Sequence, residues 1–332
     1  MVRRSHDRET LTPRTPVAAW LSVLSLDAVL VAVAWQQLLM LSFCDRGATW
    51  AECGSLAATV WLVYVADRLL DAARLDLSQP HTLRHRFYLR HRRVFFAGWV
   101  VVLLADTLVV VRYLSPELLR SGLVLASAVL VYGAGVHFPS ASSDAKGSLL
   151  RTRLRPALIP KEFRVGVLFA LGVSLTAWTS LIFHGDSGED RQVFFSLAAA
   201  TVAMAVLFGV NCVLVARFER HLDRAQSFAS IATRWQSRGE REMQLSLCVF
   251  AIVVTLPMVM MMLQLPASVG TAVAACALGL FVLAFVSDRR CWQPVTMEVQ
   301  QTTQDTFTFF DVRGVWVDVI LWTPPMVILC CM

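Results

Sequence analysis

The chain has 332 residues, of which 56% are hydrophobic and only 16% are charged, whereas an ordinary soluble domain carries about a quarter charged residues. A soluble core cannot absorb that much apolar surface, so the composition argues against a soluble globular protein. The formal net charge of +6 comes without a basic stretch interleaved with aromatic residues, which argues against nucleic-acid binding and fits contact with a lipid bilayer.

Apolar stretches of about 20 residues, long enough to cross a bilayer as a helix, recur along the whole chain. We therefore predict an all-α polytopic bundle without a separate soluble domain. Its nine transmembrane helices are predicted at Val17–Phe43, Leu56–Leu70, Val94–Val111, Leu118–His137, Val165–Phe183, Val193–Ala216, Leu245–Leu263, Ala267–Phe285 and Val315–Cys330.

The basic residues predict the orientation of these helices, because Lys and Arg gather in loops that stay on the cytoplasmic side. With the N-terminus inside, 26 of the 30 lysines and arginines lie in inner segments. The outer loops hold only Arg46, Arg112, Arg120 and Arg191. The pattern predicts a protein of the inner membrane with a cytoplasmic N-terminus and a periplasmic C-terminus.

The connecting segments carry a few further signals. The apolar run after the basic tail 1–16 is too long for a signal-peptide core and is predicted to remain as the first span. The segment His81–Arg93 predicts a basic amphipathic surface helix, in which His81 and His85 could alternatively bind a transition metal, although seven neighbouring Lys and Arg oppose a cation. Ser140–Ser148 reads as a flexible linker. Cys44 and Cys53 share the first outer loop, where a disulfide and two free thiols are both open.

Two predicted helices end in equivalent acidic segments. The second runs into Val65–Asp76 and the sixth into Asn211–Asp223, and Asp67 and Glu219 lie 152 positions apart. Each acidic end closes the second helix of a block of four, which predicts a parallel repeat. The predicted organisation is a first half at 17–137, a cytoplasmic loop at 138–164, a second half at 165–286, and a loop with the ninth helix at 287–332.

The acidic ends contain two pairs of carboxylates, Asp67 with Asp71 and Glu219 with Asp223. A spacing of four places both members of a pair on one helix face, where like charges repel and a cation would neutralise them. Mg²⁺ takes one or two carboxylates and fills its other positions with water and phosphate oxygens. The pairs therefore predict a magnesium and diphosphate site, the alternative being solvated helix ends compensated by nearby arginines.

These features resemble the UbiA-type intramembrane prenyltransferases. Glu219-x₃-Asp223 is similar to the family's second acidic motif, and Ile159–Gly172 is similar to the start of its fifth helix. In the first motif, Asn-x₃-Asp-x₃-Asp, two registers are open. Either Asp67 and Asp71 match the two acids and Val63 stands in place of the Asn, or Asp67 takes the place of the Asn and Leu75 that of the last Asp. The resemblance implies two four-helix halves with a ninth helix, a cytoplasm-facing cavity, and acidic motifs that hold Mg²⁺ and a prenyl diphosphate.

Further residues are predicted to bind the substrate. Tyr132 is similar in place to a tyrosine near the substrate in that family. Lys161 is the first candidate for a cation that stabilises the diphosphate, followed by the arginines Arg164, Arg68 and Arg220. Asn211 shares the acidic face of its helix. Asp27 lies in an apolar span, where it could orient an acceptor, act as a base, or serve as a protonated structural donor.

We therefore expect a membrane-embedded, Mg²⁺-dependent transferase that moves an isoprenoid group from its diphosphate to a lipid-soluble or aromatic acceptor. The incomplete first motif leaves open a non-catalytic relative or a transporter that binds an amphiphile. A structural membrane subunit whose acidic ends contact a partner protein is the third possibility.

Overall fold

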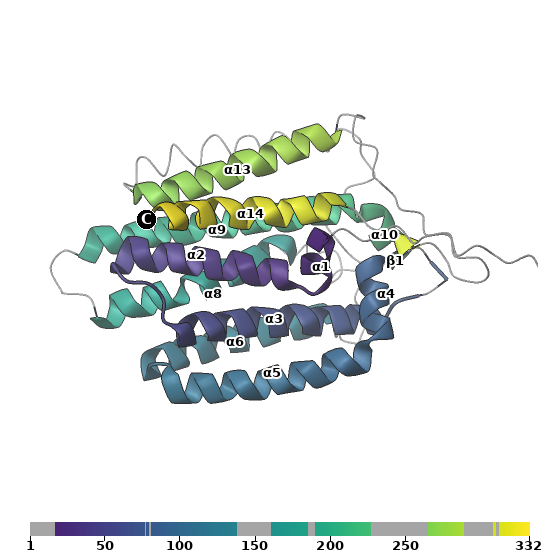
Figure 1. The fold of residues 1–332 in the computed structure, drawn as a ribbon, viewed down its shortest axis with the longest axis horizontal. Coiled ribbons are helices and arrows are strands. Elements are labelled where there is room, and N and C mark those ends of the chain that lie inside the picture. The colour runs from purple at the N-terminus through teal and green to yellow at the C-terminus, as the bar shows by residue number, and fades with distance from the viewer. Residues whose placement is uncertain are drawn as a thin grey trace, which may run out of the picture.

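The structure is a computed structural model that describes residues 17–76, 78–79, 81–137, 161–184, 190–226, 265–288, 308–309 and 312–332. Nearly all of this part of the chain is helical, and eight of its helices are long and apolar enough to cross a bilayer. The helices run side by side along one direction (Figure 1). The prediction of an all-α, polytopic membrane protein is thereby confirmed.

Eight of the nine predicted spans coincide with these long helices. They are α2 (Leu26–Cys44), α3 (Trp50–Ala73), α5 (Arg92–Tyr113), α6 (Pro116–His137), α8 (Lys161–His184), α9 (Asp190–Phe218), α13 (Ala267–Asp288) and α14 (Val312–Cys331). The seventh predicted span, Leu245–Leu263, lies outside the described residues, as do the linker Ser140–Ser148 and the tail 1–16.

The first span is shorter than predicted, because the segment Val17–Phe43 is not one helix. A short helix, α1 (Val17–Val23), precedes α2, and Ser25 between them has a left-handed backbone with φ of 57°. The break leaves carbonyl groups without helical partners, and the indole Nε1 of Trp61 donates to one of them, the oxygen of Leu24, at 3.2 Å. Hydropathy alone does not reveal such a break, since both pieces are apolar.

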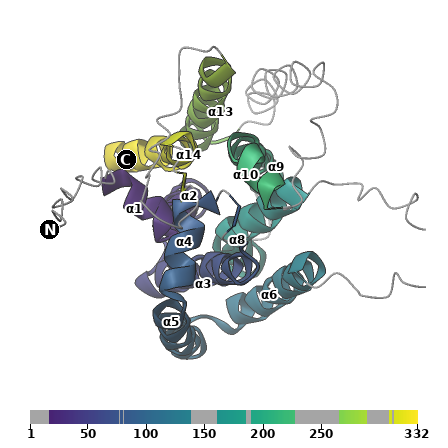
Figure 2. The same cartoon turned by 90° about the vertical axis from the view of Figure 1, so that its right-hand side faces the viewer.

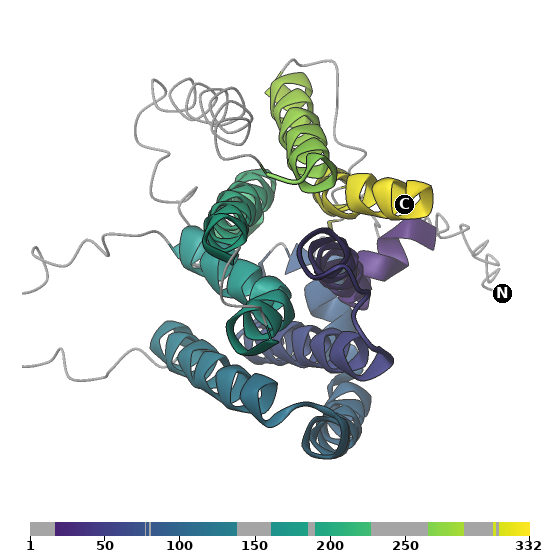
Figure 3. The ribbon, with the colours of Figure 1, turned by 90° about the vertical axis from the view of Figure 1, so that its left-hand side faces the viewer.

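The main hydrophobic core surrounds α2, which lies in the middle of the bundle (Figure 3). Trp35 and Leu38 of α2 are fully buried among side chains of α8, α9, α13 and α14. Two polar side chains tie α2 to its neighbours: the indole of Trp35 donates to the carbonyl oxygen of Leu321 at 2.9 Å, and the amide of Gln36 donates to Thr176 Oγ1 at 2.9 Å. Bonds of this kind hold apolar helices in one register where water is excluded.

Helices α5 and α6 lie at one edge of the bundle, and their outer faces are apolar. Leu104 of α5 is 65% exposed, and Val131 of α6 is 75% exposed. Such faces are unstable in water but match the hydrocarbon of a bilayer. These two helices therefore contribute lipid-facing surface to an integral membrane protein.

One end of the bundle carries the short elements and most of the described charged side chains, and we call it the charged end. It consists of α4 (Leu83–Arg90), α10 (Arg220–Ala225), and a parallel pair of two-residue strands, β1 (His81–Thr82) and β2 (Thr308–Phe309) (Figures 1 and 2). The side chain of Thr82 accepts a hydrogen bond from the amide of His85 and caps α4.

The basic segment His81–Arg93, predicted to be one surface helix, forms a helix of its own only from Leu83 to Arg90, because it begins with β1 and its last two residues belong to α5. It also packs more deeply than predicted. His81, His85 and Tyr88 are 2%, 5% and 0% exposed, respectively. Tyr88 joins a small second core with Val65 and Ala72 of α3. Because α4 is fastened to α3 in this way, the arginines on α4 are held at defined positions beside the acidic end of α3.

Candidate functional site

The four acids predicted to bind Mg²⁺ all lie at the charged end. Asp67 and Asp71 are in the last two turns of α3. Contrary to the prediction of one continuous helix, α9 ends at Phe218, and Asp223 belongs to the separate helix α10. The amide of Asp223 nevertheless donates to the carbonyl oxygen of Glu219 at 3.0 Å, so these two acids remain one helical turn apart.

Acids from the end of α3 and from the segment just after α9 lie within electrostatic range of one buried cation, Arg68. This guanidinium interacts electrostatically with Asp67, Asp71 and Glu219, and its Nη1 lies 3.9 Å from Asp67 Oδ2. Two segments 152 positions apart are thus brought together around one cation. Fold packing rather than local sequence creates this neighbourhood.

Glu219 has a second basic partner, Arg84 of α4. The Nη2 atom of Arg84 donates to both carboxylate oxygens of Glu219, at 3.2 and 3.1 Å. The two side chains are only 15% and 20% exposed, so little water screens their attraction. Arginines therefore neutralise at least part of the acidic charge, as the alternative interpretation of the sequence anticipated.

His85 adds no positive charge to this neighbourhood at physiological pH. Burial, together with the nearby Arg84 guanidinium, lowers the pKa of His85 to about 2. Its Nδ1 lies 2.9 Å from Thr82 Oγ1. The cationic groups that face the acids are therefore guanidinium groups, which keep their charge at any physiological pH.

Within the described residues, no group of three or more His, Cys, Asp or Glu side chains is arranged to hold a metal ion. The transition-metal alternative for His81 and His85 lacks a third ligand there. A complete protein cage for Mg²⁺ is also missing, but Mg²⁺ commonly binds one or two carboxylates together with substrate phosphates. The donor set, two carboxylate pairs beside guanidinium groups, fits that mode and predicts that metal and phosphate bind together.

Several predicted substrate-binding residues lie at the same end. The hydroxyl of Tyr132 in α6 donates to the backbone oxygen of Lys161 at 3.4 Å, and its ring lies within electrostatic range of Asp67 and Arg164. Lys161 and Arg164 are exposed in the first turn of α8, and Arg220 is partly buried in α10. The ends of α3, α6, α8 and α9 therefore contribute to one neighbourhood.

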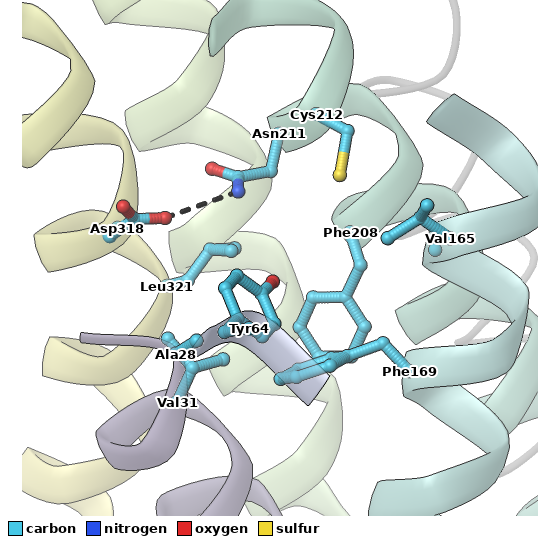
Figure 4. Close-up of a pocket in the computed structure, with 11 residues that line it drawn as sticks. Ala28, Val31, Tyr64, Val165, Phe169, Phe208, Asn211, Cys212, Asp318 and Leu321 are labelled. Atoms are coloured by element: carbon cyan, nitrogen blue, oxygen red, sulfur yellow. Dashed lines mark hydrogen bonds between the residues drawn. The ribbon is translucent and has the colours of Figure 1, made fainter. Parts of the chain in front are cut away.

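Asn211 lies deeper in the bundle than the charged cluster. Its Nδ2 donates to Asp318 Oδ1 at 3.2 Å, and both side chains line a narrow cavity between α2, α3, α8, α9 and α14 (Figure 4). About 20 Å³ of this cavity is open to the centre of a water molecule, which is room for about one water. Its other lining residues are Ala28, Val31, Tyr64, Val165, Gly166, Phe169, Phe208, Cys212 and Leu321.

Sequence reasoning missed three of these polar residues, Arg84, Asp318 and Tyr64. Asp318 carried the same signal as Asp27, an ionisable group in an apolar span, and could have been found. Arg84 was one of many basic residues in its segment, and only the docking of α4 distinguishes it. Cys44 and Cys53, whose pairing was open, are free thiols in the structure.

The geometry thus combines acidic helix ends, guanidinium groups and an intramembrane cavity with polar lining. Comparison of the chain with protein-family models, with curated proteins and with solved structures finds no significant match.

Proposed function

We propose that this chain is a membrane-embedded prenyltransferase of the UbiA type, which moves an isoprenoid group from its diphosphate to a lipid-soluble or aromatic acceptor. The observation that carries the proposal is that Asp67 and Asp71 at the end of α3 and Glu219 just after α9 all lie within electrostatic range of Arg68. Like charges from two segments so distant in sequence repel each other when they are placed together. A metal ion bound with a shared anionic ligand would offset this repulsion.

The proposal includes nine transmembrane helices in two four-helix halves and an appended ninth. The end of α9 contacts α4 through Glu219 and Arg84, whereas the start of α13 contacts the end of α2 through Ser268 and Ser42, at 2.8 Å. These contacts lie at opposite ends of the bundle (Figure 1), which supports an odd number of crossings between α9 and α13. The charged end would face the cytoplasm, since basic residues accumulate there.

The carboxylates of Asp67, Asp71, Glu219 and Asp223 would hold Mg²⁺, which would neutralise the charge that develops on the departing diphosphate. The guanidinium groups of the charged end would bind phosphate oxygens, for which their planar fork is well suited. Cationic side chains in this role are Arg68, Arg84, Lys161, Arg164 and Arg220.

The remaining residues would shape the apolar part of the site. Tyr132 and Asn211 would contact the substrate from α6 and α9. The aromatic rings of Phe169 and Phe208, whose centroids are 4.8 Å apart, would exclude water from a reactive carbocation. The cavity would have to widen when a prenyl chain enters, because it now has room for about one water.

The test is the consumption of prenyl diphosphates by the purified protein in detergent, with Mg²⁺ and a membrane lipid extract as the source of acceptor. We expect diphosphate release that EDTA abolishes and that falls by about 100-fold or more in Asp67→Asn and Glu219→Gln. Asp45→Asn, a change of an exposed acid at the opposite end of the bundle, should leave the rate unchanged. Release at the wild-type rate in both acid variants would refute the proposed site.

A second candidate is a protein that binds an anionic amphiphile without transforming it. It is favoured by the contact of both Glu219 carboxylate oxygens with Arg84, which leaves this carboxylate engaged by a cation of the protein itself. The two candidates differ in one assay. Saturable binding of a prenyl diphosphate without any product across several chain lengths would support the second candidate and exclude the first.

A further inference from the structure

Two buried carboxyl groups meet inside the bundle, away from the acidic helix ends. Asp27 lies in the first turn of α2 and is 9% exposed, and Asp318 lies about two turns into α14. The side chain of Asp318 interacts with the side chain of Asp27. Their helices are packed together and are also joined by the bond from the Trp35 indole to the Leu321 carbonyl oxygen, so the pair is held in place by the main core.

The pair borders the narrow cavity through Asp318. Figure 4 shows Asp318 and Asn211 facing each other across it, with the ring of Tyr64 nearby. The Oδ1 atom of Asn211 is buried and has no hydrogen-bond partner among the described residues. A buried acceptor without a partner in a cavity of this size is a place for a water molecule.

Electrostatics limits the charge that this pair can carry. Two carboxylates in contact repel each other, and their repulsion is strong where little water screens it. A direct hydrogen bond between two carboxyl groups also requires a proton on one of them. An ionised carboxyl group within a membrane span is costly, and the basic group that acts on Asp318, Arg84, is already bonded to Glu219.

We propose that Asp27 and Asp318 form an intramembrane proton-binding site, in which the two carboxyl groups share one exchangeable proton that reaches them through the cavity. The proton arrives from water in the cavity, binds a carboxylate oxygen of the pair, and leaves by the same route. No metal, substrate or partner is needed for this site. It goes beyond the proposed transferase and stands without it.

The groups around the pair come from four helices. Asn211 and Cys212 of α9, Tyr64 of α3 and Arg84 of α4 interact with it, and Arg68 of α3 acts in turn on Tyr64 and Cys212. Lys161 and Glu162 of α8 lie beyond Cys212. The guanidinium groups keep one charge at all relevant pH values, so they attract a single negative charge on the pair without supplying or removing a proton.

The test uses the full-length protein in detergent and a hydrophobic carbodiimide, which adds to a protonated carboxyl group in apolar surroundings. Labelling is followed by peptide mass spectrometry from about pH 6 to about pH 9. We expect one adduct per chain, on the peptide of Asp27 or of Asp318, with labelling that falls about tenfold for each pH unit above its midpoint. The exposed Asp76 should remain unlabelled.

Variants distinguish a proton shared by the two carboxyl groups from the protonation of a single buried carboxyl group. Asp27→Asn and Asp318→Asn each remove one like charge, so the midpoint for labelling the remaining acid should move to lower pH, and the double variant should lose the adduct. Asp76→Asn is the control and should leave the midpoint unchanged. Absence of an adduct on both peptides, or single variants that leave the midpoint where it was, would overturn the proposal.

A second measurement does not depend on the folding of any variant. The infrared spectrum of the wild-type protein should contain the carbonyl stretching band of a protonated carboxyl group, and the band should shift in D₂O and fade as the pH rises through the labelling midpoint. A spectrum in which this band is absent at the lower pH would overturn the proposal. Neither readout involves prenyl diphosphate, so loss of the transferase hypothesis would leave this test unaffected.

Discussion

At the scale of single residues, the charged end depends on guanidinium groups that are held in place by packing. Arg84 is part of α4, which is packed against α3. Its contacts with Glu219 join α4 to the end of α9, although the two residues are 135 positions apart. A partly buried pair of this kind differs from an ordinary surface ion pair, which contributes little. The cost of breaking it lies mainly in the charge that is left without its partner.

We predict that Arg84→Ala lowers the free energy of unfolding of the purified protein by about 1–3 kcal/mol, because Glu219 loses a charged hydrogen-bond donor while it remains largely buried. Arg90→Ala is the matched control, since Arg90 is exposed on the same helix, and it should change stability by less than about 0.5 kcal/mol. A double-mutant cycle with Glu219→Gln measures the coupling. Additive effects of Arg84→Ala and Glu219→Gln would contradict the interpretation.

The lowered pKa of His85 predicts a dependence of stability on pH. The unfolded chain binds a proton on this imidazole below its ordinary pKa of about 6.5, whereas the folded protein does not until the pH approaches about 2. The contribution of buried His85 is therefore complete above about pH 6.5 and is lost progressively as the pH falls, by up to about 1.4 kcal/mol per unit.

The measurement is the melting temperature in detergent at about pH 7 and about pH 5, compared with that of His85→Gln. The wild type should lose more stability on acidification than the variant does. Equal losses would show that the imidazole is protonated in the folded protein.

The charged candidates could be predicted from the sequence where the signal is local. A spacing of four between Asp67 and Asp71 is visible in the chain, and so is an aspartate such as Asp27 in an apolar span. The partner of each acid was not predictable, because Arg84 and Asp318 reach their partners only through the packing of α4 and α14. A single sequence carries no information about which of many basic residues docks against a given carboxylate.

At the scale of elements, α8 and α9 approach each other closely at Gly166. A Cβ atom at Gly166 would lie 2.5 Å from the backbone nitrogen of Gly209 and 2.6 Å from the carbonyl oxygen of Ala205. Small residues at such crossings allow helix backbones to approach closely in membranes. The approach positions Asn211 and Cys212, half a turn beyond Gly209, against the cavity.

We therefore predict that Gly166→Ala destabilises the protein by about 1–3 kcal/mol, because backbone atoms cannot yield as side-chain atoms do. Gly172→Ala in the same helix is the matched control. Its Cβ atom would lie 3.8 Å from Leu125 Cδ2, an ordinary contact, so the change should be neutral or stabilise the helix by up to about 1 kcal/mol. Equal melting temperatures for the two variants would contradict the close packing.

Hydropathy predicted where the long helices lie, but it did not predict where they begin, break or end. Eight predicted spans correspond to long helices, yet the break at Ser25 and the end of α9 at Phe218 were not predicted. Apolar length reports how much chain a bilayer can hold. It is insensitive to a single residue with a left-handed backbone, whose conformation depends on contacts such as that of Trp61 with the Leu24 carbonyl oxygen.

At the scale of the whole molecule, the proposal of nine crossings predicts opposite locations for the two termini. The proposal places the C-terminus outside the cytoplasm, where alkaline phosphatase folds into an active enzyme and green fluorescent protein does not become fluorescent. Alkaline phosphatase fused after Met332 should therefore be active in cells, and green fluorescent protein fused there should be dark. The same pair fused before Met1 should behave in the opposite way. A fluorescent fusion after Met332 would indicate an even number of crossings and would remove the support for two parallel halves.

If the charged end is a joint site for metal and diphosphate, it should bind Mn²⁺ in place of Mg²⁺. Electron paramagnetic resonance measures this binding directly. Since the described residues hold no complete metal cage, we expect little binding to the protein alone. We predict about one or two Mn²⁺ per chain when a non-reactive prenyl thiodiphosphate is added, with loss of this binding in Asp67→Asn and in Glu219→Gln. Unchanged Mn²⁺ binding in both variants, or none with the diphosphate analogue present, would contradict the account.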